Sequence, residues 1–340
     1  MIIEPQHNES VRQHTPAEQQ DQFTGSRAAK PPLMQLTASS GNNVVQRANP
    51  LTKAQVQTAL TFYSGRSTDF TAAIIKEIQK KVGVTESGTM DEATVQGVAT
   101  FQQGKGLTVN GQLDTQTITL FFPHGLQLAT AQAGFASDFL GIQWNTHKTA
   151  QAKAQALVDA INNQLKTAGV PGVGVKLQGG LGAASGHFNF PTWEMALDQN
   201  LFAQANIPQA QLDKMANYVY HESRHAEQWF NMAQVLAGQG KTAAQITTTM
   251  GIPRNIADEA VKSPIAQGSS KALVVSGWWE NVYGSGRVQR NTTINNVVTN
   301  NTPANYAAYK AMPEESDAFQ AGDGFDAALA AERAKPKQNK

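Results

Sequence analysis

The chain has 340 residues, a length that predicts about two domains. Charged residues make up only 16% and the formal net charge is +1, so no global field points to a nucleic acid or an anionic membrane. There is no cysteine, which excludes disulfides and thiolate metal ligands. Any bound metal must therefore be held by histidine and carboxylate side chains.

Residues 1–50 are rich in Gln, Asn, Ser, Thr and Pro and show little apolar periodicity, which predicts a disordered leader. Its apolar pieces are short, Leu33–Leu36 and Val44–Arg47. The alternative is a docking or loading segment that a partner recognises. The first residues lack a basic segment followed by an apolar stretch, so we expect no secretory signal and an export route that needs none. No apolar run is long enough to span a membrane.

Residues 51–123 show helical patterns at 52–63, 70–82 and 90–104. Thr89 and Glu92 predict a capping box at the start of the third helix. The region also contains an internal repeat: residues 83–94 align without gaps on residues 106–117. Each copy has a glycine that closes a helix, a second glycine in a turn, and an Asp and a Thr that begin the next helix.

This repeat, with Phe101-Gln102 between its copies, resembles the peptidoglycan-binding domain 1 family. The resemblance covers roughly residues 55–122. It implies a three-helix module that binds bacterial cell wall, and we assign residues 51–123 to such a domain. The alternative is a helical spacer that keeps the fold and binds no sugar.

Residues 124–330 are predicted to form one α+β domain, followed by a polar, basic and flexible tail at 331–340. The patterns predict, in chain order, a low-charge connector at 124–144, a helix starting near 145 and ending near 166, a strand at 173–177, a hairpin at 186–197, a long helix at 208–237, two helices within 241–268 and an exposed loop at 287–302. The predicted fold class is therefore mainly α with a small β-sheet.

The long helix contains an H-E-x-x-H motif, formed by His221, Glu222 and His225. Residues four apart project from the same face of a helix, so the two histidines can bind one zinc ion together. Glu222 would then lie beside the metal, where its carboxylate can take a proton from a water molecule. The alternative is a pair of exposed histidines on an amphipathic helix.

A catalytic zinc site needs three protein ligands and an open position. No histidine follows His225, so the third ligand is expected to be a downstream carboxylate. The candidates are Asp258, Glu259, Glu280, Glu314, Glu315 and Asp317.

The segment from Tyr309 to Ala318 resembles the Y-x-x-x-P-x-E-x-(E/D)-A pattern that supplies the last ligand in many bacterial zincins. The resemblance implies that Glu315 is the third ligand and that Asp317 hydrogen-bonds a ligand histidine to set its tautomer. Glu314 would be solvated. The alternative is that Glu314, Glu315 and Asp317 only form the acidic first turn of a helix, where negative charges are common.

A helix, short strands and an H-E-x-x-H helix follow one another as in zincin catalytic domains of the gluzincin type. That resemblance implies that the strand before the motif helix borders a cleft and can pair with an extended peptide. The core H-E-x-x-H-x-x-Q also resembles the DUF4157 family, with an insertion between His225 and Glu315. Members of that family are regarded as zinc peptidases and occur among cargo and accessory proteins of extracellular contractile injection systems.

These observations predict a metallopeptidase with one Zn²⁺ that acts on a peptide or on peptidoglycan. It would be targeted to bacterial cell wall, or exported as an injection-system effector after a cytoplasmic stage. Injection-system components are candidate partners, whereas a nucleic acid is not. Candidates for an oxyanion donor are Tyr306, Tyr309, Tyr283 and His187. The alternatives are a non-catalytic zincin-like protein of a secretion particle, and a maturation protease that trims partners or its own leader.

Overall fold

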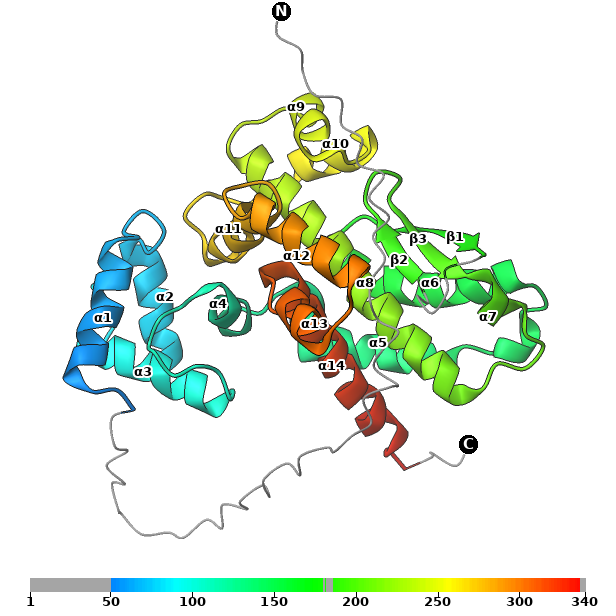
Figure 1. Ribbon diagram of the computed structural model, residues 1–340, viewed down its shortest axis with the longest axis horizontal. Coiled ribbons are helices and arrows are strands. Elements are labelled where there is room, and N and C mark those ends of the chain that lie inside the picture. The colour runs from blue at the N-terminus through cyan, green and yellow to red at the C-terminus, as the bar shows by residue number, and fades with distance from the viewer. Residues whose placement is uncertain (1–49, 180, 182–185, 337–340) are drawn as a thin grey trace, which may run out of the picture. The chain divides into compact units, whose positions relative to one another are not determined.

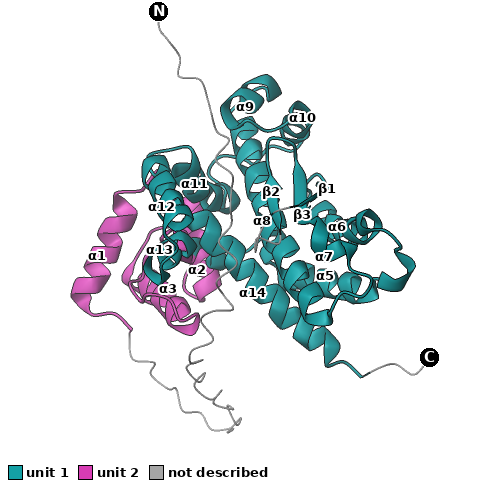
Figure 2. Cartoon of the chain, turned by 45° about the vertical axis from the view of Figure 1, so that its right-hand side comes forward, with its two compact units in different colours: residues 1–17, 118–340 teal, residues 18–117 magenta. Residues whose placement is uncertain are grey.

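The computed structural model describes residues 50–179, 181 and 186–336, and it is mostly helical with one three-stranded sheet (Figure 1). This confirms the predicted mainly α class with a small sheet. The chain divides into two compact units, Glu18–Thr117 and Met1–Ala17 with Ile118–Lys340 (Figure 2). The predicted leader lies outside the described residues, except for its last residue. None of the described helices is long and apolar enough to cross a membrane.

The smaller unit contains three helices and the start of a fourth: α1 Lys53–Ser64, α2 Ala72–Val82, α3 Glu92–Gly104 and α4 Thr115–Phe121. Thr52 and Thr71 cap the first two helices by accepting a backbone hydrogen bond from the first turn. The predicted capping box of Thr89 and Glu92 is wrong, because Asp91 caps α3 instead. The Asp91 carboxylate accepts from both the backbone N–H and the hydroxyl of Thr94, at 2.8 and 2.5 Å.

Two buried glutamines, Gln79 and Gln102, lie 23 residues apart and explain the internal repeat. The amide nitrogen of each donates to a backbone carbonyl at 2.9 Å and to a threonine hydroxyl at 3.2 Å. The partners are Thr89 and Thr94 for the first glutamine, and Gln112 and Thr117 for the second. The amide oxygens accept from Gly88 and Gly111, whose φ of 77° and 70° favour glycine. A glutamine thus fixes each turn, and this accounts for the repeat whether or not the unit binds sugar.

The larger unit contains the rest of the described helices and strands. In chain order they are η2 Gly125–Gln127, α5 Ala129–Gly141, η3 Trp144–Thr146, α6 Ala150–Thr167, β1 Gly174–Gln178, β2 Gly186–Asn189, β3 Glu194–Asp198, α7 Gln199–Ala203, α8 Gln209–Gly238, α9 Ala243–Met250, α10 Arg254–Lys262, α11 Ser270–Val282, α12 Arg287–Thr299, α13 Pro303–Lys310 and α14 Pro313–Arg333. The last helix thus extends three residues into the predicted tail.

The long helix α8 forms the centre of this unit. It follows Pro208, as predicted, and every residue from Tyr218 to Gln234 is buried. α14, α10, α11, α6 and β2 pack against it. A helix that is buried on all sides would normally be apolar. The charged and polar residues in this stretch therefore need partners inside the protein.

The sheet has the strand order β1-β3-β2. β1 pairs with β3 in parallel, and β2 pairs with β3 antiparallel, with Phe188 opposite Met195. The predicted hairpin is confirmed, and Pro191 and Thr192 lie in its turn. β2 is an edge strand of this sheet and packs on α8. The hairpin therefore brings an edge strand of the described sheet to the motif helix.

The predicted connector at 124–144 is wrong, because most of it forms η2, α5 and η3. Phe135 and Phe139 of α5 are buried, and the Phe135 ring packs against Tyr220 and Phe325 at centroid distances of 5.4 and 5.0 Å. The segment is therefore a helix with one buried apolar face rather than an irregular connector. The next helix begins after Thr149, which caps it, rather than near residue 145.

The predicted exposed loop at 287–302 is also wrong, because residues Arg287–Thr299 form α12. Its Asn and Thr residues have low helix propensity, which was the basis of the prediction. Val297 nevertheless packs with Tyr309 and Met312 in a buried cluster that also contacts Phe319. Tertiary packing therefore outweighs the intrinsic preference of this segment.

Candidate metal centre

The two histidines of the motif lie one turn apart on α8, and their ring centroids are 4.9 Å apart. His221, Glu222 and His225 are all buried. The alternative, a pair of exposed histidines on an amphipathic helix, is therefore excluded. Because buried polar groups are costly without partners, this cluster calls for a compensating group.

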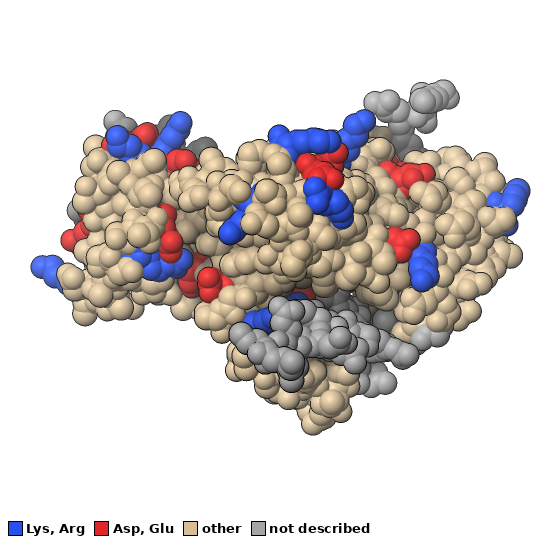
Figure 3. All heavy atoms as spheres, turned by 90° about the horizontal axis from the view of Figure 1, so that it is seen from above, with Lys and Arg blue, Asp and Glu red and all other residues tan. Residues whose placement is uncertain are grey.

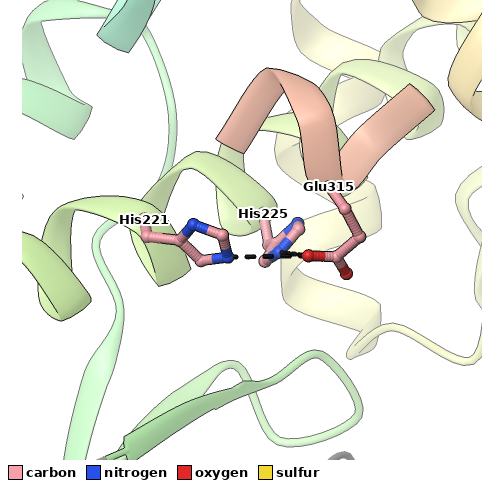
Figure 4. A group of neighbouring side chains, drawn as sticks. All are labelled: His221, His225 and Glu315. Atoms are coloured by element: carbon pink, nitrogen blue, oxygen red, sulfur yellow. Dashed lines mark ion pairs between the residues drawn. The ribbon is translucent and has the colours of Figure 1, made fainter. Parts of the chain in front are cut away.

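Glu315 brings a carboxylate to the histidines from the first turn of α14 (Figure 4). Its Oε2 atom lies 3.6 Å from Nε2 of His221 and 3.4 Å from Nε2 of His225. The ligand atoms of the three residues all lie within 4.8 Å of one another. Tetrahedral zinc with bonds of about 2.0 Å separates neighbouring ligand atoms by about 3.3 Å. The group could therefore hold a metal ion.

The charges of these side chains depend on one another. Burial would raise the pKa of Glu315, but the two histidines, led by His225, hold it well below its usual range. Burial would likewise lower the pKa of His225, but the carboxylates of Glu315 and Glu222 raise it to about 9. The site therefore favours a positive charge between these ligands, and a divalent cation could replace the proton.

Two carboxylate oxygens at the site, Oε1 of Glu222 and Oε2 of Glu315, have no hydrogen-bond partner among the described residues. A buried oxygen that accepts no hydrogen bond lowers the stability of the fold by about 1–3 kcal/mol, and by more when the group is charged. A metal ion with an associated water molecule would supply both partners. The residues present therefore fit a bound metal.

Glu222 is fixed by the sheet. Its Oε2 atom accepts a hydrogen bond of 3.0 Å from the backbone N–H of Phe188 in β2. The edge strand and the motif helix are thus joined at the residue expected to act as a base. This contact leaves Oε1 of Glu222 free to accept a proton.

Asp317 does not bond a ligand histidine directly, contrary to the prediction. Its carboxylate accepts from Nε of Arg224 at 2.8 Å, and from the side-chain amides of Gln228 and Gln127 at 2.7 Å each. The residue that contacts the histidine is Gln228, whose Oε1 lies 2.8 Å from Nδ1 of His225. A fixed guanidinium and two amides already occupy the Asp317 oxygens, so Asp317 reaches His225 only through Gln228.

Arg224 is fully buried within the motif itself. Its guanidinium pairs with Asp317 and with Glu227, where Nη1 lies 2.7 Å from Oε2, and it also donates to the carbonyl of His124 at 3.0 Å. The ring of Trp278 lies 5.3 Å from its Cζ atom. This buried ion-pair network was not predicted from the sequence. The available signal was a charged residue, Arg224, between the two histidines of the motif helix.

Glu314 is buried, whereas we predicted it to be solvated. Its carboxylate accepts from Nε of Arg290 and from the amide of Asn281, both at 2.6 Å. α11 and α12 thereby hold the start of α14, which carries Glu315. Glu314 belongs to this anchor and not to the ligand group.

The remaining carboxylate candidates also lie outside the ligand group. Asp258 pairs with Arg254 at 3.0 Å and Glu259 with Lys262 at 2.7 Å, all on the exposed side of α10. Glu280 accepts from the backbone and hydroxyl of Ser285. Among the described residues, Glu315 is the carboxylate that groups with the two histidines.

The four candidate oxyanion donors differ in their positions. The hydroxyl of Tyr309 hydrogen-bonds Glu315, while that of Tyr283 donates to the carbonyl of Met250 at 3.0 Å. His187 lies half-buried on β2. The hydroxyl of Tyr306 is buried without a hydrogen-bond partner in the described part of the chain, and burial together with Glu315 raises its pKa to about 12. Tyr306 is thus a protonated hydroxyl with unused bonding capacity near the ligand group.

Aromatic rings surround the histidines. The Phe319 ring lies 4.6 Å from that of His221, and the Trp229 ring 6.1 Å from that of His225, centroid to centroid. Neither residue was predicted to contact the site. Their spacing along α14 and α8 is ordinary helical spacing, so the sequence held no signal for them.

We compared the chain with protein-family models, with curated proteins and with solved structures, and found no match in any of the three.

Proposed function

We propose that the protein is a zinc-dependent metallopeptidase whose metal ligands are His221, His225 and Glu315. The observation that carries the proposal is the meeting of these three buried residues beside Glu222. Histidine nitrogens with one carboxylate oxygen are a ligand set that zinc prefers in hydrolases. When bound, zinc supplies a Lewis acid that polarises a carbonyl group and makes water nucleophilic near neutral pH.

The chain's own residues would carry the proton transfers. Oε1 of Glu222 accepts a proton from the attacking water, while Oε2 stays anchored to Phe188. The same carboxylate then delivers the proton to the leaving amine. Tyr306 is the candidate best suited to donate a hydrogen bond to the developing oxyanion, because its hydroxyl has no other partner in the described part of the chain. β2 is an edge strand of the described sheet and lies beside Glu222, so an extended peptide would bind along this side of the site.

The smaller unit supports a role at bacterial cell wall through its repeat, which resembles wall-binding modules. The substrate would then be a wall peptide, or a protein reached after export as an injection-system effector. On the face shown in Figure 3, Lys and Arg side chains are interspersed with Asp and Glu side chains.

The first test replaces Glu222 with glutamine, which keeps the hydrogen-bond acceptor for Phe188 but removes the base. We expect one zinc per chain in both proteins and a loss of peptide hydrolysis of at least about 100-fold in the variant. Metal content is measured by elemental analysis, and cleavage of a random peptide mixture and of purified peptidoglycan by mass spectrometry. Glu259→Gln, on the exposed side of α10, is the control with unchanged activity.

A wild-type protein that binds one zinc but cleaves neither substrate would contradict the peptidase proposal. It would favour the second candidate, a zincin-like structural protein, which the burial of all three ligands also supports. In that case Glu222→Gln leaves function intact, whereas His221→Ala unfolds the larger unit. A third candidate, the maturation protease, predicts a processed N-terminus in the wild type that is absent in Glu222→Gln.

A further inference from the structure

Gln228 connects the candidate metal centre to α14. Its side-chain oxygen faces a ligand histidine, and its side-chain nitrogen faces two hydrogen-bond acceptors. Its Oε1 atom lies 2.8 Å from Nδ1 of His225. Its Nε2 atom donates to the backbone carbonyl of Glu314 at 2.8 Å and to Oδ2 of Asp317 at 2.7 Å. Both acceptors are oxygens without a proton to donate, so the amide can be oriented in only one way.

This orientation determines the protonation of the histidine ring. Because an amide oxygen can only accept, Nδ1 of His225 must carry the proton and donate it to Gln228. Once a metal replaces the second ring proton, the lone pair of the ring is on Nε2, the atom that lies 3.4 Å from Oε2 of Glu315. The ring thus presents its free nitrogen to the other ligands.

The orientation of Gln228 is itself held by buried charges. Asp317, which accepts from Gln228, is paired with Arg224 through Nε at 2.8 Å and Nη2 at 3.2 Å, and it accepts from Gln127 at 2.7 Å. Arg224 and Asp317 are both buried, so neither can turn towards solvent. A chain of contacts therefore runs from Arg224 through Asp317 and Gln228 to His225.

We propose that Gln228 is the positioning residue of the metal centre, that its amide holds His225 as the Nδ1–H tautomer, and that Arg224 and Asp317 act on the metal through it. This inference rests on the proposed function, because it requires a metal at His221, His225 and Glu315. A neutral amide is a weaker acceptor for the ring N–H than a carboxylate, so it raises the basicity of the histidine ligand less. A metal bound at this site would therefore be more electrophilic than one whose histidine donates to a carboxylate.

The test compares two glutamines of α8. Gln228→Met keeps the volume of the side chain but removes every hydrogen bond to His225, Glu314 and Asp317. Gln234→Met is the matched control, because Gln234 is also buried and donates to the backbone and hydroxyl of Ser263 at 2.7 and 2.9 Å, away from the ligands. Zinc affinity is measured by competition with a chromophoric chelator, and ligand geometry by the visible spectrum of the Co²⁺-loaded protein.

We expect Gln228→Met to weaken zinc binding by about 10–100-fold and to alter the Co²⁺ spectrum. Gln234→Met should leave both unchanged even if it lowers stability. Wild-type affinity and an unchanged spectrum in Gln228→Met would overturn the inference while leaving the metal centre intact. A wild type that binds no zinc would remove the metal centre and this inference together.

A measurement on the wild type covers the case in which Gln228→Met does not fold. With ¹⁵N-labelled histidine, the two imidazoles that respond to zinc can be identified by NMR. We expect one of them to show a slowly exchanging Nδ1–H with the metal on Nε2. If both rings bind zinc through Nδ1, or if neither has a protected Nδ1–H, the inference is wrong.

Discussion

At the scale of single residues, the main feature is a set of buried charges that compensate one another. Arg224 lies between Asp317 and Glu227, and although burial disfavours its charge, these two carboxylates hold its pKa above the usual value. Breaking one partner of such a buried group leaves the others uncompensated, which is far less favourable than losing an exposed ion pair. The network therefore restricts the arrangement of α8 against α14 to one geometry.

A second feature at the scale of single residues is His124, which makes the stability of the fold depend on pH. Burial, followed by the nearby charges of Arg224 and Lys271, lowers its pKa to about 3. Its unfolded value is about 6.5, so between the two values the unfolded chain binds a proton that the folded chain does not. Neutral His124 therefore contributes stability above pH 6.5 that is lost as the pH falls towards 3.

We expect His124→Gln to remove this pH dependence. As the pH falls from 7 to 5, the wild type should lose up to about 1.4 kcal/mol per pH unit relative to the variant. Urea unfolding at both pH values, with a chelator present so that metal release does not contribute, measures the difference. A difference in unfolding free energy that is the same at pH 7 and pH 5 would contradict the assignment.

At the scale of elements, α5 is part of the core rather than a connector. Phe135 is fully buried against the rings of Tyr220 and Phe325, which belong to α8 and α14. Tyr220 immediately precedes the first metal-ligand candidate, and its hydroxyl donates to the carbonyl of Leu126 at 2.7 Å. α5 and η2 therefore support the helices that carry the ligands.

Phe135→Ala tests this support. We expect it to lower the unfolding free energy by about 3–5 kcal/mol, because the cavity cannot be filled by its neighbours. Leu140→Ala, on the same helix but 39% exposed, should change it by no more than about 0.5 kcal/mol. Chemical denaturation followed by circular dichroism measures both, and equal effects would show that α5 is not part of the core.

At the scale of the whole molecule, the candidate metal ligands and the internal repeat belong to different units. The three candidate ligands and all five tryptophans, Trp144, Trp193, Trp229, Trp278 and Trp279, lie in the larger unit. Tryptophan fluorescence therefore reports on the unit expected to hold the metal. The buried glutamines that explain the repeat lie in the smaller unit.

Removal of the metal should destabilise the larger unit. Saturation at 100 times the dissociation constant stabilises a folded state by about 2.7 kcal/mol. We expect a chelator to lower the midpoint of the thermal transition seen by tryptophan fluorescence, and added Zn²⁺ to restore it. Glu315→Gln should abolish this response. A midpoint that is indifferent to both chelator and Zn²⁺ would argue against a metal in this unit.

The sequence by itself predicted that His221, Glu222 and His225 lie together on one helix, because a four-residue spacing is a local property. It also predicted the hairpin and the start of α8, since turn residues and Pro208 act over short distances. Glu315 was indicated only by resemblance, and its approach to the histidines depends on the packing of α14 against α8.

Tertiary structure alone decided the partners of the buried polar groups. Asp317 bonds Arg224 and Gln228 instead of a histidine, and Glu314 is buried by Arg290. Likewise, α12 is helical despite its composition, because Val297 packs against residues of later helices. Contacts between segments far apart in the chain depend on how helices pack, and no spacing within one segment encodes them.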